Sequence, residues 1–158
     1  MPTSLPATDT ETKFGDPDTR IGQTARWTVL LRPKQPTLGA LVVVCREPVK
    51  ALGEVSALAF AELREVVARV EAMLAETIVY ERINWLLLMM VDRDVHFHVL
   101  PRYAGTREHG GAVVADAGWP GAPALEPAVT LDATARDALL VRLRAAWQRP
   151  AGGAARPA

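Results

Sequence analysis

The chain has 158 residues, of which 49% are hydrophobic, and its 18 basic and 18 acidic residues give a formal net charge of zero. A neutral chain has no general attraction for nucleic acid or for an anionic membrane, so a phosphate ligand would have to be held by local donors. The length indicates one domain, and the apolar content suffices for a sizeable core.

The single cysteine, Cys45, excludes an internal disulfide bond and suits a reducing compartment. Residues 1–15 lack the apolar core of a signal sequence. No apolar stretch reaches the roughly 20 residues that a membrane-spanning helix needs. We therefore expect a soluble cytoplasmic protein without a membrane partner.

The first 26 residues are rich in threonine, aspartate and proline and show no sustained periodicity, so we expect an irregular N-terminal arm. Residues 27–32 are β-formers and predict a strand. Two prolines and a glycine mark the connection to a second predicted strand over 40–45. That strand is apolar on both faces, which favours a central place in the sheet.

Ser56 is well placed to cap a long helix that ends between Thr77 and Tyr80. Apolar side chains recur behind it with a helical period. They are Phe60, Leu63, Val66, Val67, Val70, Met73 and Leu74. A core-facing helix explains this stripe, and a cofactor-binding role is not expected.

Apolar residues over 83–91 and 94–103 predict a hairpin of two strands, with a tight turn at Asp92-Arg93. The glycines and prolines of 104–129 make a stretch longer than most structureless connections, which indicates a functional or packing loop.

Asp132 is predicted to cap a final helix that runs to about Gln148, followed by a disordered tail over 149–158. The order of these elements predicts an α+β fold with an antiparallel sheet, one long helix and one C-terminal helix, in a single domain over 27–148.

Two of the three histidines, His96 and His98, alternate with the β-formers Val95 and Phe97. Side chains alternate faces along a strand, so Asp94, His96 and His98 should project together, roughly 6–7 Å from one neighbour to the next. One phosphate or one metal ion could touch more than one of them. Two histidines in a strand also arise by chance in a core, but a central hairpin is a rigid mount for chemistry.

This segment, Asp94-Val95-His96-Phe97-His98-Val99-Leu100, resembles the signature of the histidine triad (HIT) superfamily of nucleotide hydrolases and transferases, in which three histidines alternate with apolar residues. Pro101-Arg102-Tyr103 is similar to the Pro-Arg that often follows the signature. Asp116-Ala117-Gly118-Trp119-Pro120 resembles a downstream Asp…Trp-Pro segment. The resemblance covers about Trp27 to Pro120 and implies the HIT fold.

The chain departs from the superfamily pattern in three places. Asp94 stands where the first histidine of the triad is usual. Gly39-Ala40 replaces a frequent Gly-His pair, and Met90-Val91 replaces the Gln/Ser-Thr pair that many members carry.

The resemblance implies that His96 attacks the α-phosphorus of a nucleotide and forms a nucleotidyl-histidine intermediate, which water or another acceptor then resolves. Neutral imidazole is a competent nucleophile near pH 7, and a second imidazole, His98, can orient it or stabilise charge. Asp94, with an ordinary pKa of about 3.9, would be a weaker proton donor than histidine. Its carboxylate could instead pair with Arg93 or Arg102.

Asn84 and Arg102 are the candidate substrate-binding residues, for a ribose or a phosphate. A turn role for Asn84 and a surface role for Arg102 remain open. The expected partner is a nucleotide or an adenylylated small molecule, with no metal and no cofactor. Members of the superfamily often dimerise, so a homodimer is left open too.

Two other functions compete with this one. Asp94, His96 and His98 could ligate a metal ion if His109, otherwise a solvated loop residue, assisted them. Alternatively, the substitutions at Asp94 and Ala40 could leave a nucleotide-binding module with weakened catalysis.

Overall fold

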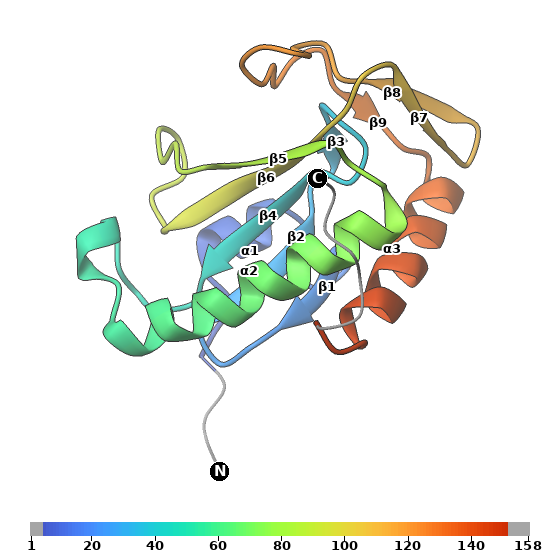
Figure 1. The fold of residues 1–158 in the computed structure, drawn as a ribbon. Helices are drawn as coiled ribbons and strands as arrows, with labels where there is room; N and C mark the ends of the chain where they lie inside the picture. Colours follow the sequence, from blue (N-terminus) through green and yellow to red (C-terminus); the bar gives the residue numbers. More distant parts are fainter. Residues whose placement is uncertain (1–4, 152–158) are drawn as a thin grey trace.

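The structure is a computed structural model that describes residues 5–151. A five-stranded antiparallel sheet forms its centre, in the order β1-β2-β4-β6-β5 (Figure 1). The strands are β1 (Arg20–Gln23), β2 (Trp27–Leu31), β4 (Leu41–Cys45), β6 (His96–Arg102) and β5 (Arg82–Leu86). The predicted α+β class, with an antiparallel sheet, a long helix and a C-terminal helix, is confirmed.

Smaller elements surround this sheet. Strand β3 (Lys34–Gln35) pairs with β9 (Val129–Thr130), and β7 (Thr106–His109) pairs with β8 (Ala112–Ala115). The helices are α1 (Asp9–Lys13), the 3₁₀ turn η1 (Leu52–Glu54), α2 (Ala57–Thr77) and α3 (Ala133–Trp147).

One face of the sheet is covered by α2, with α3 beside it (Figure 1). The Ser56 hydroxyl accepts a hydrogen bond from the Ala59 N–H, so the predicted cap and the predicted end of this helix at Thr77 are both confirmed. The indole N–H of Trp27 on β2 donates to the Ala59 carbonyl at 2.8 Å and fixes the helix to the sheet. Asp132 caps α3 in the same way, as predicted.

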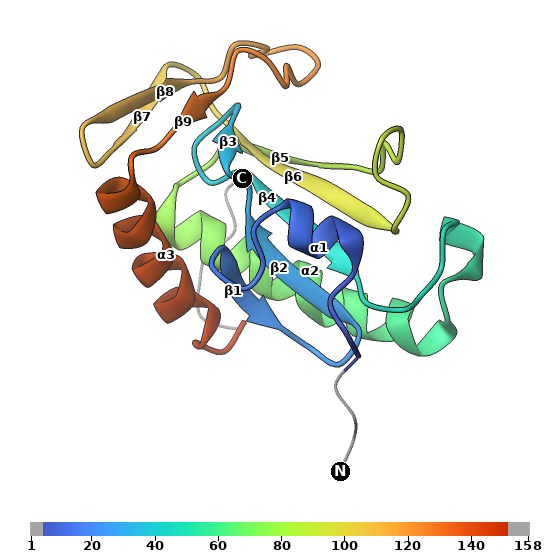
Figure 2. The ribbon, with the colours of Figure 1, turned by 180° about the vertical axis from the view of Figure 1, so that it is seen from behind.

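The opposite face of the sheet is covered by α1 (Figure 2). The residue after this helix, Phe14, packs against Leu30, Val42 and Val44, which are fully buried. The sheet is therefore apolar on both faces at its centre, which explains why β4 is an unbroken apolar run.

The prediction of an irregular arm over residues 1–26 was wrong for the part that the structure describes. Thr8 and Glu11 form a capping box that starts α1, and β1 adds an edge strand to the sheet. A five-residue helix is too short to show a period, and tertiary packing stabilises both elements. Residues 1–4, and residues 152–158 of the predicted tail, lie outside the described part of the chain.

The predicted tight turn at Asp92-Arg93 was also wrong. Strand β5 ends at Leu86 and β6 begins only at His96, so a loop joins them. Met89 in this loop has a φ of 48°, which no strand allows. The 104–129 stretch contains the β7–β8 hairpin and the start of β9, so it is partly regular rather than one long loop.

Within residues 5–151, no helix combines the length and the apolar character needed to cross a membrane. A cytoplasmic location for the protein stays a prediction.

Gly22 tests whether the N-terminal strand belongs to the core. A β-carbon at this position would overlap the Trp147 indole ring on α3. We expect Gly22→Ala to lower the free energy of unfolding by about 1–3 kcal/mol, as overpacking does. Gly53→Ala is the matched control, because a β-carbon added there in η1 would meet nothing within 4 Å. Urea denaturation of both variants measures the difference, and equal midpoints would contradict the docking of β1 on α3.

Candidate functional site

Strand β6 presents both motif histidines to the face that α1 covers. His96 pairs with Val44 and His98 with Val42 of β4, so all four side chains share this face. The centroids of the two imidazole rings lie 5.0 Å apart. Phe14 closes over them, with its ring centroid 6.4 Å from His96 and 5.9 Å from His98. No sequence pattern had singled out Phe14, because its contact depends on how α1 docks.

His96 is fixed in one orientation and one tautomer. It is 1% exposed, and its Nδ1 lies 2.6 Å from the backbone carbonyl oxygen of Asp94. A carbonyl oxygen can only accept a hydrogen bond, so Nδ1 must carry the proton. The lone pair of the neutral ring is then on Nε2, the atom from which His96 can act as a nucleophile.

His98 is held neutral. Burial, reinforced by the neighbouring His96 ring and by the positive charge of Arg32, lowers its pKa to about 4. Its Nδ1 is buried and has no hydrogen-bond partner among the described residues. At pH 7 this ring is therefore an uncharged donor or acceptor beside His96, with one nitrogen whose hydrogen-bonding capacity is unused.

The Asp94 side chain is directed to the N-terminal segment and to Lys50. One carboxylate oxygen accepts from the Thr10 backbone N–H at 3.0 Å, and the other accepts from the Lys50 ammonium group. Burial alone would raise the pKa of Asp94, but these hydrogen bonds outweigh it and lower the pKa below the ordinary value. Asp94 is therefore a carboxylate at neutral pH, and its backbone carbonyl is the group that touches His96.

Arg102 and Asn84 lie together, but in a buried network. The Arg102 guanidinium donates to both carboxylate oxygens of Asp116, at 2.6 and 3.2 Å, and to the Asn84 side-chain oxygen at 2.7 Å. It also donates to the Gly121 carbonyl at 3.0 Å. Arg102 is 3% exposed, so the alternative of a surface cation was wrong. The network ties the Asp116–Gly121 loop to β6, and a substrate role for Asn84 and Arg102 stays a prediction.

The geometry gives no support to the metal-binding alternative. Across residues 5–151, no three histidine, cysteine or acidic side chains are grouped so that they could hold an ion. His109, which would have had to assist, has its Nε2 2.8 Å from the Ala135 carbonyl oxygen on α3. Cys45 is fully buried, and burial raises its pKa to about 11, which agrees with an inert core residue.

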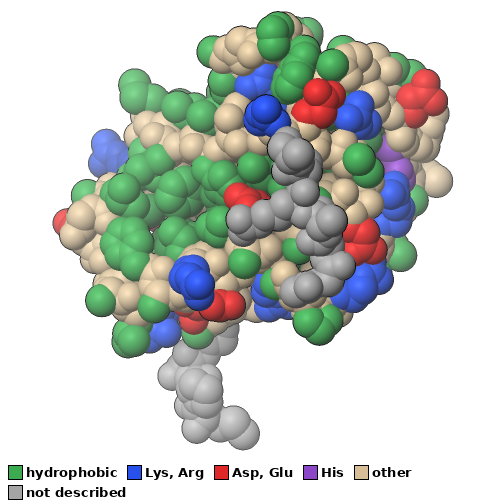
Figure 3. All heavy atoms as spheres, in the orientation of Figure 1, with side chains coloured by type: hydrophobic (Ala, Val, Ile, Leu, Met, Phe, Trp, Pro, Cys, Tyr) green, Lys and Arg blue, Asp and Glu red, His purple; other side chains and the backbone are tan. Residues whose placement is uncertain are grey.

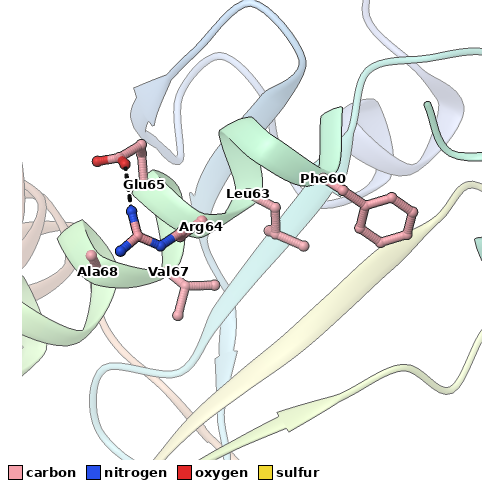
Figure 4. A pocket seen from close by; sticks show the side chains of 6 residues that line it. All are labelled: Phe60, Leu63, Arg64, Glu65, Val67 and Ala68. Atoms are coloured by element: carbon pink, nitrogen blue, oxygen red, sulfur yellow. Dashed lines mark hydrogen bonds and ion pairs between the residues drawn. The ribbon is translucent and has the colours of Figure 1, made fainter. Parts of the chain in front are cut away.

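A second surface feature lies on the other side of the sheet. An apolar hollow of about 570 Å³ opens along α2, on the face seen in Figure 3. Phe60, Leu63 and Val67 point into it from the helix (Figure 4). The hollow contains neither motif histidine and no buried polar group, so we do not assign it to catalysis.

The formation of a homodimer stays a prediction.

Comparison with known proteins agrees with this architecture. No protein-family model and no curated protein matches the chain. A histidine triad protein from Sinorhizobium meliloti superposes with a TM-score of 0.70 at 22% identity, over 89% of this chain and 96% of that one. One from Bradyrhizobium japonicum gives 0.70 at 20% identity, over 90% and 97%.

A hypothetical histidine triad nucleotide-binding protein from Sulfolobus tokodaii gives a TM-score of 0.63 at 15% identity, over 82% of this chain and 83% of that one. At such identities the likeness shows the fold. The chain therefore has the histidine triad fold, as the resemblance of its motif implied.

His98 provides a pH test of the site. Its folded-state pKa of about 4 lies below the ordinary 6.5, so between these values the unfolded chain binds more protons. The stability contributed by neutral His98 should be complete above about pH 6.5 and be lost as the pH falls toward 4. NMR titration of the ring should give a midpoint near 4, and His98→Gln should flatten the stability profile in this window. A midpoint near 6.5 would show that the ring is solvated.

Proposed function

We propose that this protein is a nucleotide hydrolase or nucleotidyl transferase of the histidine triad type, acting at the α-phosphate through a nucleotidyl-histidine intermediate on His96. The observation that carries the proposal is the 2.6 Å contact between His96 Nδ1 and the Asp94 carbonyl oxygen, which leaves the lone pair on Nε2. A nucleophile of this kind needs no metal ion and no cofactor.

The bonds, electron pairs and protons of the proposed reaction are accounted for by His96, the leaving group and the acceptor. His96 Nε2 donates its lone pair to the α-phosphorus, and the bond from phosphorus to the leaving group breaks, with its electron pair going to that group. The ring becomes positively charged while Nδ1 keeps its proton, and the Asp94 carbonyl dipole stabilises this charge. Water, or another acceptor, then attacks the same phosphorus, loses a proton, and returns the electron pair to Nε2.

The ionised state of Asp94 constrains the substrate. A carboxylate whose pKa is lowered cannot give a proton to a departing group at pH 7. His98, which stays neutral, is not an acid of useful strength either. The proposal therefore favours leaving groups that depart without a proton, as in phosphoanhydrides and aryl phosphoesters, over alkoxides and amines.

The competing proposal is a nucleotide-binding module with weakened catalysis. The substitutions at Asp94 and Ala40 motivate it, because they remove two histidines that the superfamily pattern contains. The intact Nδ1 contact of His96 favours the enzyme, since a binding module has no use for an oriented nucleophile.

Intact-protein mass spectrometry tests the proposal. After brief reaction with a p-nitrophenyl ester of AMP, an acid-labile adenylyl adduct should map to His96. His96→Ala should lose the adduct, and kcat should fall by about three orders of magnitude or more, as for other removed nucleophiles. His109→Ala is the matched control and should react normally. Turnover retained in His96→Ala would remove His96 from this role, and nucleotide binding without turnover in the native protein would favour the binding module.

A further inference from the structure

Arg32 extends β2 by one residue on the histidine face. Its backbone N–H donates to the Ala40 carbonyl at 3.0 Å, which continues the pairing of β2 with β4. Leu30 pairs with Val42, and Val42 pairs with His98, so these residues form one row across the sheet. Arg32 lies two residues beyond Leu30 and thus on the same face. Sheet spacings place its Cα about 12 Å from that of His98.

The backbone at Arg32 is held in place by a buried side chain. The Gln35 amide group donates to the Arg32 carbonyl at 2.6 Å and to the Ala40 carbonyl at 3.0 Å. Its oxygen accepts from the Gly39 N–H at 2.8 Å. The position from which the guanidinium extends is therefore set before any ligand binds.

Several cations near this side of the sheet are paired with carboxylates. The ion pairs are Lys13–Asp92, Lys50–Asp94, Arg46–Glu11 and Arg102–Asp116. Arg32 makes no ion pair within the described residues. Its guanidinium donates from Nη1 to the Lys34 carbonyl at 2.9 Å, and its Nε is buried without a hydrogen-bond partner.

Arg32 is also partly withdrawn from water. Burial lowers its pKa, and the negative charge of Glu126 only partly offsets this effect. The same guanidinium contributes to the low pKa of His98, so its field reaches the imidazole pair. A half-buried cation without an anionic partner is costly, and a ligand anion would remove that cost.

The side chain between Arg32 and β6 is small. Ala40, which directly precedes β4, stands opposite Arg32, at the place where the superfamily pattern has a histidine. His96 and His98 thus follow one another along β6, and Arg32 lies one row further along the sheet and two strands away.

We propose that Arg32 binds a second phosphate of the substrate, beyond the phosphoryl group that His96 attacks, and so selects nucleotides with two or more phosphates. The inference rests on the proposed function and names the substrate class of that site. Arginine suits the task because its planar guanidinium can donate two parallel hydrogen bonds to phosphate oxygens. The second phosphate can belong to an anhydride chain or to the sugar.

Calorimetric binding of AMP, ADP and adenosine 3′,5′-bisphosphate to the full chain tests the inference. Native protein should bind one of the two doubly phosphorylated probes more tightly than AMP. The tighter probe shows whether the second phosphate belongs to an anhydride chain, as in ADP, or to the sugar, as in the bisphosphate. Arg32→Gln should weaken that probe about tenfold or more, a typical loss for a charge-assisted hydrogen bond, and leave AMP nearly unchanged. Arg32→Lys keeps the charge and should lose less.

Arg64→Gln is the matched control, because the side chain of this arginine is 86% exposed on α2 and pairs with its neighbour Glu65. Thermal melting should show that all variants fold. If native protein binds AMP but Arg32→Gln weakens all three probes equally, or none, the inference fails while the proposed function stands. If native protein binds none of the three, the proposed function fails with it.

Discussion

The contact between His96 Nδ1 and the carbonyl oxygen of Asp94 is the constraint on which the chemistry of this site depends. It spans 2.6 Å between residues two apart in sequence, in a place from which solvent is excluded. In so short a contact a carbonyl oxygen needs a donor, so the ring proton is committed to Nδ1. The other residues of the site either keep this contact in place or surround the free Nε2 of His96.

Asp94 holds the His96 ring through its backbone carbonyl, because its side chain forms hydrogen bonds with other residues. The carboxylate accepts from Thr10 and Lys50 and so joins α1 and the segment between β4 and η1 to the β5–β6 loop, directly before β6. Phe14, at the end of the same helix, then closes over both imidazoles. Asp94, at the first position of the motif, thus couples the N-terminal segment to the strand that carries the histidines. The result is a buried pair of imidazoles, of which His96 is held in one orientation.

Local signals in the sequence were sufficient for much of this architecture. Ser56 and Asp132 start α2 and α3 where their capping side chains predicted, because a cap acts within one turn. The strand period correctly placed His96 and His98 on one face. The role of Arg102 could not be predicted, because its partner Asp116 is brought to it by the fold of the intervening hairpin. Phe14 was missed for the same reason, because its contacts with the two histidines depend on residues distant in sequence.

The protonation pattern of the His96 ring tests the central claim most directly. Nitrogen-15 NMR of the free protein near pH 7 distinguishes a protonated from an unprotonated ring nitrogen for each histidine. We predict a neutral His96 with the proton on Nδ1 and a bare Nε2, and a proton on Nδ1 that exchanges slowly with water because the site is buried. A His96 that carries its proton on Nε2, or that is doubly protonated at this pH, would contradict the proposed role of the Asp94 carbonyl.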